Sequence, residues 1–236
     1  MRILAVSDVE CPALWDYFVR GRLDGYDMIL SCGDLKAEYL SFLVTMSHAR
    51  LLYVHGNHDG SYDRKPPEGC ENIDGQLVIC KGVRILGLGG SLCYNGGPYQ
   101  YTEKQMQRRI TRLRSAIRKA GGVDIVIAHA PPRGLGDLDD PAHRGFESFR
   151  ELIDQYHPRM FLHGHTHLSY GAGIGREMTA GETRVVNVSE RYSLDFPEEE
   201  CLSAKKEGLV YVTRRRQGRS DGSGQEGVAN PRYRMP

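Results

Sequence analysis

Residues 51–59 have the sequence LLYVHGNHD, in which a short apolar run leads directly into a segment rich in polar side chains. A continuous apolar run of this length is typical of a β-strand that is buried on both faces. Four other apolar runs also end in loops with metal-binding side chains. They are Arg2–Val6 before Asp8, Met28–Leu30 before Asp34, Val123–Ala128 before His129, and Met160–Leu162 before His165 and His167. Because ligands gather at the carboxyl ends of strands in α/β sheets, we expect the five loops to converge on one site.

Two amphipathic segments predict helices between these strands. Residues 103–120 place their apolar side chains on one stripe, and residues 146–156 repeat the pattern. Basic residues, Arg109 among them, surround the first stripe. We interpret them as a solvated helix face and not as a nucleic-acid site, because the whole chain has a formal charge of only +1.

Two dipeptides predict β-hairpins. Asp74-Gly75 and Lys81-Gly82 each stand at the end of a short apolar run. Hairpins require antiparallel strands, which would then lie beside the parallel ones. The expected fold class is therefore α/β with a mixed sheet.

Composition excludes several classes of protein. The chain has 236 residues with ordinary hydrophobic and charged fractions, and its near-neutral charge disfavours a dedicated nucleic-acid partner. No apolar run approaches the roughly 20 residues of a membrane span. The six cysteines form no CxxC pair, and the first residues do not resemble a secretory signal. We therefore expect free thiols and a cytoplasmic location, with no membrane partner.

The character of the sequence changes near its end. From Arg214 onward the residues are basic, glycine-rich and without apolar periodicity. The sequence therefore predicts one domain over residues 1–213, followed by a basic, disordered tail over residues 214–236.

The strand-end loops together supply a set of candidate functional residues. They are Asp8, Glu10, Asp34, Asn57, His58, His129, His165 and His167. A single histidine in such a loop is usually structural, whereas the full ordered set is specific. Oxygen and imidazole donors without cysteine favour Mn, Fe, Zn, Co or Ni over a structural zinc held by thiolates.

This set resembles the calcineurin-like metallophosphoesterase superfamily. The family pattern is Asp-x-His, Gly-Asp, Gly-Asn-His-Asp/Glu, His and Gly-His-x-His. The corresponding strings are Asp8-Val9-Glu10, Gly33-Asp34, Gly56-Asn57-His58-Asp59, His129 and Gly164-His165-Thr166-His167. The resemblance covers roughly residues 1–213. It implies two mixed β-sheets sandwiched between helices.

The resemblance also implies two divalent metal ions and a role for each residue. The first ion would be bound by Asp8, Glu10, Asp34 and His167. The second would be bound by Asp34, Asn57, His129 and His165. Asp34 bridges the two, since a carboxylate can span ions ~3.5–4 Å apart. Glu10 departs from the family histidine. It either ligates the first metal, which would favour Mn or Mg, or points elsewhere and leaves that site weak or empty.

The implied activity is hydrolysis of a phosphoester. A hydroxide that bridges the two metals would attack phosphorus in line. His58 is not a ligand in the family pattern, and it would give a proton to the departing oxygen or stabilise the phosphate. Asp59 would orient His58 or be purely structural.

Substrate class depends on smaller features. Gly33-Asp34-Leu35-Lys36 lacks the arginine of the family's phosphoprotein phosphatases, which disfavours that branch. Residues 186–189 and the string His-Ala-Pro-Pro from His129 look more like the branch that cleaves cyclic nucleotides. We therefore favour a small phosphodiester, such as a cyclic nucleotide. The alternatives are a phosphomonoesterase, a nuclease of the same superfamily, or a catalytically weakened protein-binding scaffold.

The remaining candidates receive plainer interpretations. We expect solvent exposure for His48 and His157, and a buried thiol for Cys32. For His55 and His163 we expect a place behind the ligands or a packing role, and not metal binding. His143 lies in a loop that could line the pocket, and Arg133 either contacts a phosphate or is a surface residue.

Overall fold

A computed structural model of the chain describes residues 1–170 and 175–197. The tail expected over residues 214–236 and the last part of the expected domain lie outside these described residues. Two mixed β-sheets form the centre of the described part of the chain.

The first sheet has five strands. Its order is β13 (Glu190–Asp195), β1 (Arg2–Ser7), β2 (Met28–Ser31), β3 (Arg50–Tyr53) and β4 (Glu71–Asn72). Strands β1 to β4 are parallel to their neighbours, and β13 pairs with β1 in the antiparallel direction.

The second sheet has six strands. Its order is β11 (Glu177–Ala180), β12 (Thr183–Asn187), β10 (Met160–His163), β9 (Ile125–Ala128), β6 (Val83–Leu88) and β5 (Leu77–Cys80). The four central strands are parallel, and the two edge strands are antiparallel to their neighbours. A short pair, β7 (Ser91–Leu92) and β8 (Gln100–Tyr101), stands apart from both sheets.

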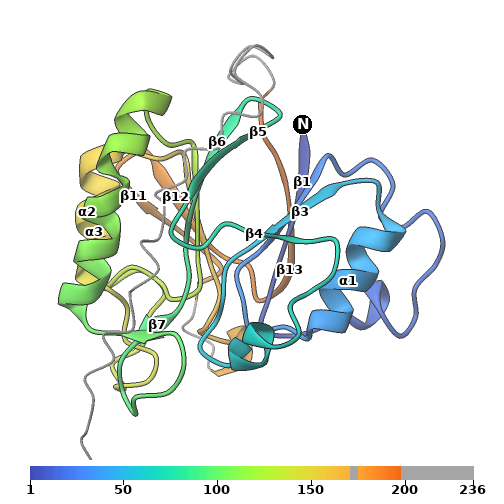
Figure 1. The fold of residues 1–236 in the computed structure, drawn as a ribbon, viewed down its shortest axis with the longest axis horizontal. Coiled ribbons are helices and arrows are strands. Elements are labelled where there is room, and N and C mark those ends of the chain that lie inside the picture. The colour runs from blue at the N-terminus through green and yellow to red at the C-terminus, as the bar shows by residue number, and fades with distance from the viewer. Residues whose placement is uncertain (171–174, 198–236) are drawn as a thin grey trace, which may run out of the picture.

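The elements form four layers (Figure 1). Helix α1 (Ala37–Met46) covers the outer face of the first sheet, and α2 (Glu103–Ala120) and α3 (Glu147–Tyr156) cover the outer face of the second. Within residues 1–170 and 175–197, three short 3₁₀ helices lie in the connections: η1 (Pro12–Leu14), η2 (Asp59–Asp63) and η3 (Leu168–Tyr170). The central core lies between the sheets and includes Ile3, Leu52, Ile127 and Leu162, all fully buried. The expected sandwich of two mixed sheets between helices is thus confirmed.

The expected helices and strands agree closely with the observed ones. Helix α2 begins after Thr102, which forms a capping box with Gln105, and it ends at Gly121 in the left-handed conformation. The five strands expected before the loops with the candidate ligands are β1, β2, β3, β9 and β10.

One hairpin prediction is confirmed and the other is wrong. Lys81-Gly82 connects β5 and β6, and both residues have positive φ, as a two-residue hairpin turn requires. Asp74-Gly75 instead joins β4 of the first sheet to β5 of the second. The chain crosses between sheets there, so the two flanking runs do not pair.

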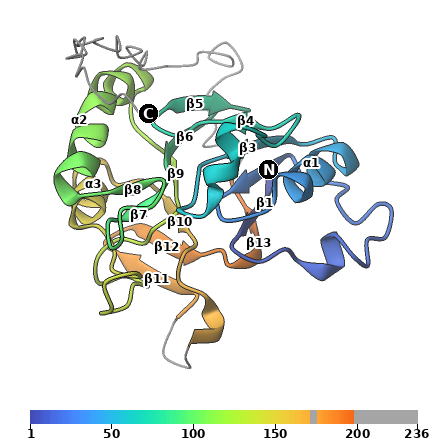
Figure 2. The same ribbon diagram turned by 60° about the horizontal axis from the view of Figure 1, so that its bottom comes forward.

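Parallel strand order sets the location of the polar loops. The carboxyl ends of β1, β2 and β3 lie at one edge of the first sheet, and those of β9 and β10 lie at one edge of the second. Figure 2 shows these strands in the middle of the molecule, between α1 and the α2–α3 pair. Backbone hydrogen bonds join neighbouring loops: Asp8 N–H donates to Gly33, and Gly164 N–H donates to His129. No helix of the described residues is long and apolar enough to cross a membrane.

Candidate metal centre

The backbone is unusual where three of the expected ligands leave their strands. Asp8, Asp34 and His165 have φ values of 65°, 56° and 68°. This region costs energy for side chains other than glycine, and such strain is concentrated at functional sites. Three of the expected ligands thus share a strained backbone conformation.

Glycines allow the loops to approach one another closely. A Cβ at Gly56 would overlap with the Asp34 carboxylate, and a Cβ at Gly164 would overlap with the side chains of Ser7 and Asp8. A Cβ at Gly33 would overlap with the Gly56 backbone. The close approach of these loops therefore requires glycine at all three positions.

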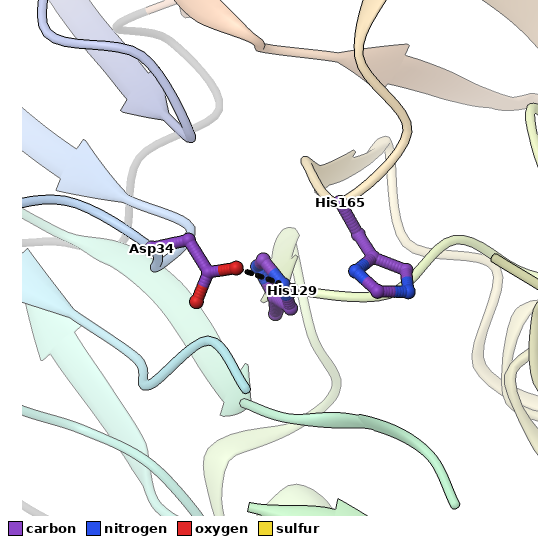
Figure 3. A group of neighbouring side chains, drawn as sticks. All are labelled: Asp34, His129 and His165. Carbon is purple, nitrogen blue, oxygen red and sulfur yellow. Dashed lines mark ion pairs between the residues drawn. The ribbon is translucent and has the colours of Figure 1, made fainter. Parts of the chain in front are cut away.

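Asp34, His129 and His165 form the cluster (Figure 3). Each offers a possible ligand atom, and these atoms lie within 4.8 Å of one another. The Asp34 carboxylate points toward His129, with Oδ2 at 3.2 Å from Nε2. The rings of His129 and His165 are 4.8 Å apart. The structure thus brings together ligand candidates from three different strand ends.

Hydrogen bonding orients the His129 ring so that its Nε2 faces Asn57 and Asp34. Its Nδ1 lies 2.8 Å from the carbonyl oxygen of Cys32, which requires the proton on Nδ1. Nε2 lies 3.0 Å from Asn57 Oδ1 and 3.2 Å from Asp34 Oδ2; it donates to these oxygens when the ring is protonated and offers a lone pair when the ring is neutral. Three electron-rich atoms therefore converge on one point. Burial alone would lower the pKa of His129, but the carboxylates of Asp34 and Asp8 raise it to about 9, so this point attracts positive charge.

Asp8 has an unsatisfied carboxylate oxygen. Its Oδ1 accepts a hydrogen bond from the backbone N–H of His165 at 2.9 Å. Its Oδ2 is buried and has no hydrogen-bond partner among the described residues. Burial raises the pKa of Asp8. A buried, unpaired carboxylate oxygen is costly unless a cation or donor meets it, so the residues present fit a metal ion.

Asp59 connects two of the loops. Its Oδ2 accepts hydrogen bonds from the backbone N–H groups of Asp34 at 2.9 Å and Gly56 at 2.7 Å. Asp34 in turn accepts from the backbone of His58 at 2.8 Å. Burial alone would raise the pKa of Asp34, but His129 lowers it to about 2. Of the two interpretations of Asp59, these bonds support the structural one.

Other expected residues stand outside the cluster. Glu10 Oε1 accepts from the Lys36 backbone at 3.3 Å and lies 3.7 Å from the Lys36 ammonium nitrogen. His167 is half-buried and is not among the clustered ligands, and the side chain of His58 is exposed. Their roles as metal ligands and proton donor stay predictions.

The loop before α3 reaches the cluster. His165 Nε2 lies 2.7 Å from the carbonyl oxygen of Ala142, and the His143 ring is 5.2 Å from the His165 ring. His143 therefore lies beside the cluster. Arg133 forms ion pairs with Asp137 and Asp139 of the same connection.

The other histidines and Cys32 match their plainer interpretations. His48 and His157 are exposed, and His163 is buried. The buried His55 ring stacks on Tyr99, and Cys32 is fully buried.

Three features were not found from the sequence. Tyr94 accepts a hydrogen bond from Asn57 Nδ2 at 3.3 Å. The buried Asn187 donates from Nδ2 to the carbonyl of Thr166 at 2.6 Å and so holds the loop of His165. Arg109 was assigned to a solvated face, which is wrong, because its guanidinium is mostly buried in an ion pair with Asp74.

Comparison with known proteins identifies the family. The model of the calcineurin-like phosphoesterase family matches residues 1–169, and the chain belongs to this family. It is a metal-dependent family acting on phosphoesters, in agreement with the clustered ligands. No curated protein matches the sequence.

Solved structures support the same fold. One crystal structure matches with a TM-score of 0.60 and 16% identity, covering 82% of this chain and 94% of that chain. The crystal structure of TT1561 of Thermus thermophilus matches with a TM-score of 0.55 and 19% identity, covering 80% of this chain and 89% of that chain. At these identities the likeness establishes the fold.

Proposed function

We propose that the protein is a dinuclear metal-dependent phosphoesterase that cleaves a small phosphodiester. One observation carries the proposal. His129 Nε2, Asn57 Oδ1 and Asp34 Oδ2 converge on one point, and the Asp8 carboxylate nearby has a buried oxygen without a partner among the described residues. A set of acceptors this dense, with few donors, is what divalent cations require.

The ligand assignment follows the family pattern. Asp8, Glu10, Asp34 and His167 would hold the first ion. Asp34, Asn57, His129 and His165 would hold the second. When bound, the two ions lower the pKa of coordinated water towards neutral and neutralise charge on the phosphate oxygens.

The protein's own groups position this chemistry. The Cys32 carbonyl holds the His129 ring through Nδ1, so its Nε2 faces the site. His58 is tied to Asp34 through its backbone while its side chain is exposed. We assign to that side chain the transfer of a proton to the departing oxygen, because it can reach an ester that enters from solvent.

The donor set favours hard ions. Asp8, Glu10 and Asp34 contribute three carboxylates, and Asn57 contributes an amide oxygen. Oxygen donors suit Mn²⁺ and Mg²⁺, whereas imidazole suits Zn²⁺, Co²⁺, Ni²⁺ and Fe. We propose Mn²⁺ as the ion that supports the highest rate.

A panel of phosphoesters tests the proposal. The metal-stripped protein is reloaded with each of Mn²⁺, Mg²⁺, Zn²⁺, Co²⁺, Ni²⁺ and Fe²⁺ and assayed on monoesters, diesters, nucleic acid, and 2′,3′- and 3′,5′-cyclic nucleotides. We expect the highest rate with Mn²⁺ and a small diester, and loss of turnover on replacing Asp34 with Asn. Preference for a monoester or for nucleic acid would select the alternative enzyme of the same family.

One observation favours a second candidate. Glu10 bonds to Lys36 and stands outside the cluster, which is consistent with a weakened first site. A protein-binding scaffold would take up fewer than two metal ions and turn over nothing in the panel. Elemental analysis of the purified protein, together with the panel, separates the two candidates.

A further inference from the structure

The carboxamide of Asn57 can serve a metal ion only through its oxygen. Its nitrogen carries two hydrogens and has no lone pair to give, so the orientation of the amide decides whether it is a ligand. In the structure Oδ1 faces His129, and Nδ2 faces the hydroxyl of Tyr94 at 3.3 Å. Asn57 is 3% exposed, so its amide hydrogens need partners within the protein.

We infer that Tyr94 is a positioning residue of the metal centre, whose hydroxyl accepts from the Asn57 amide and holds its oxygen toward His129. This inference rests on the proposed function. An acceptor on the nitrogen satisfies the amide in its metal-binding orientation and increases the negative charge on the oxygen.

The loop that carries Tyr94 is held in shape by Gln100. Its Oε1 accepts from the backbone N–H groups of Tyr94 at 3.1 Å, Asn95 at 3.2 Å and Gly96 at 3.2 Å. Strands β7 and β8 bring the two ends of the loop side by side. These contacts fix the place of Tyr94 within the protein.

The same segment contacts the loop of Asn57 at two further points. The backbone N–H of Gly90 donates to the carbonyl of His55 at 2.7 Å. The ring of Tyr99 stacks on the ring of His55, with centroids 4.2 Å apart and planes 13° apart. Three contacts, of three different kinds, thus join residues 90–99 to residues 55–57, and the one made by Tyr94 reaches an expected ligand.

Metal binding by three proteins tests the inference. The full chain, its Tyr94→Phe variant and a Tyr26→Phe control are stripped of metal and titrated with Mn²⁺ by calorimetry. Tyr26 is a matched control because its hydroxyl also forms a hydrogen bond, to Ser193 at 2.6 Å. It lies two residues before β2 begins, at the opposite end of that strand from Asp34.

We expect Tyr94→Phe to weaken the binding of one Mn²⁺ ion by roughly 10–100-fold, the usual effect of losing a hydrogen bond behind a ligand. The affinity for the other ion should be unchanged, and so should the melting temperature of the metal-free protein. The control variant should bind both ions as the wild type does. Excess Mn²⁺ should restore the turnover of the variant. Gln100→Ala should weaken the binding of the same ion, because the substitution releases the loop that carries Tyr94.

Two results would overturn the inference while the proposed function stands. The first is an active wild type whose Tyr94→Phe variant binds both ions as tightly as the control. The second is turnover that stays low at saturating Mn²⁺, which would place Tyr94 on the substrate. A wild type that takes up no Mn²⁺ and hydrolyses no phosphoester would overturn the proposed function and the inference with it.

Discussion

Replacing Arg109 with Ala should destabilise the protein far more than replacing its neighbour Arg108. The Arg109 guanidinium pairs with Asp74, donates to the carbonyl of Gly89 at 2.8 Å and lies 4.3 Å from the ring centre of Tyr101. The side chains of Arg109 and Asp74 are 14% and 3% exposed. Arg108 is exposed on the same helix.

The expected loss of stability follows from the Asp74 charge, which stays buried when Arg109 is removed. Removing one partner of a buried ion pair costs about 3–5 kcal/mol, because the remaining charge is then buried without compensation. For a chain of this size, 1 kcal/mol corresponds to about 2–4 °C, so the melting temperature should fall by roughly 6–20 °C. Arg108→Ala removes an exposed side chain and should change stability by less than about 0.5 kcal/mol.

The effect should also depend on pH. Burial alone would raise the pKa of Asp74, but the Arg109 charge and His55 lower it below its ordinary value. A depressed pKa contributes stability that is present above the unfolded value, about pH 4, and is lost as pH falls through the folded value. In Arg109→Ala, the Arg109 charge no longer offsets the effect of burial on the pKa of Asp74. The pKa therefore rises, and the neutral carboxyl is favoured. The stability gap between wild type and variant should therefore be widest near neutral pH and narrow below about pH 4.

Urea unfolding at several pH values, with metal removed, measures this gap. Melting temperatures of the two variants give an independent estimate at neutral pH. Equal losses in Arg109→Ala and Arg108→Ala would refute the buried ion pair. A gap that does not change with pH would refute the role of the Asp74 charge.

Three further predictions concern the candidate metal centre. His58→Ala should lower kcat roughly 10²–10⁴-fold on unactivated esters and less on nitrophenyl esters, with metal content unchanged; equal losses on both would remove the acid role. Glu10→Ala should lose the first metal selectively, and Glu10→His should raise relative activity with Zn²⁺, Ni²⁺ or Co²⁺; two metals bound by Glu10→Ala at wild-type affinity would make Glu10 a bystander. Gly56→Ala should reduce metal uptake sharply, because the added Cβ overlaps with the Asp34 carboxylate; unchanged uptake in elemental analysis would show that the loops are not tightly packed.

The strands that carry the site could be predicted because a buried strand has a recognisable local sequence. A strand covered on both faces is apolar throughout, and the polar residue that follows marks its end. The expected run Met28–Leu30 corresponds to β2 (Met28–Ser31), and Asp34 follows three residues later. Helix α1 has no comparable signal. It has ten residues, and its Lys36 N-cap makes no side-chain hydrogen bond. The apolar residues Phe42 and Val44 are only partly buried, so the apolar pattern does not mark the buried face clearly.

The two wrong predictions, the hairpin at Asp74-Gly75 and the solvated Arg109, have one physical cause. In both, the structure depends on a contact with residues far away in the sequence. Asp74-Gly75 has the composition of a hairpin turn, but a turn dipeptide does not determine which sheet the next strand joins. Arg109 resembles the other basic residues of its helix. Only the position of Asp74, which lies 35 residues earlier, turns its side chain inward.

The same distinction applies to the residues of the candidate metal centre. Its expected ligands could be predicted because a carboxylate, amide or imidazole at a strand end is a chemical signature that survives in the sequence alone. The groups that orient those ligands have no such signature. They are the carbonyl of Cys32 behind His129, the carbonyl of Ala142 beside His165 and the hydroxyl of Tyr94 beside Asn57. Every residue has a carbonyl, and tyrosine is common, so only the fold selects which of them becomes a hydrogen-bond partner. Sequence motifs therefore indicate the expected ligands, whereas the hydrogen bonds behind them must be read from the structure.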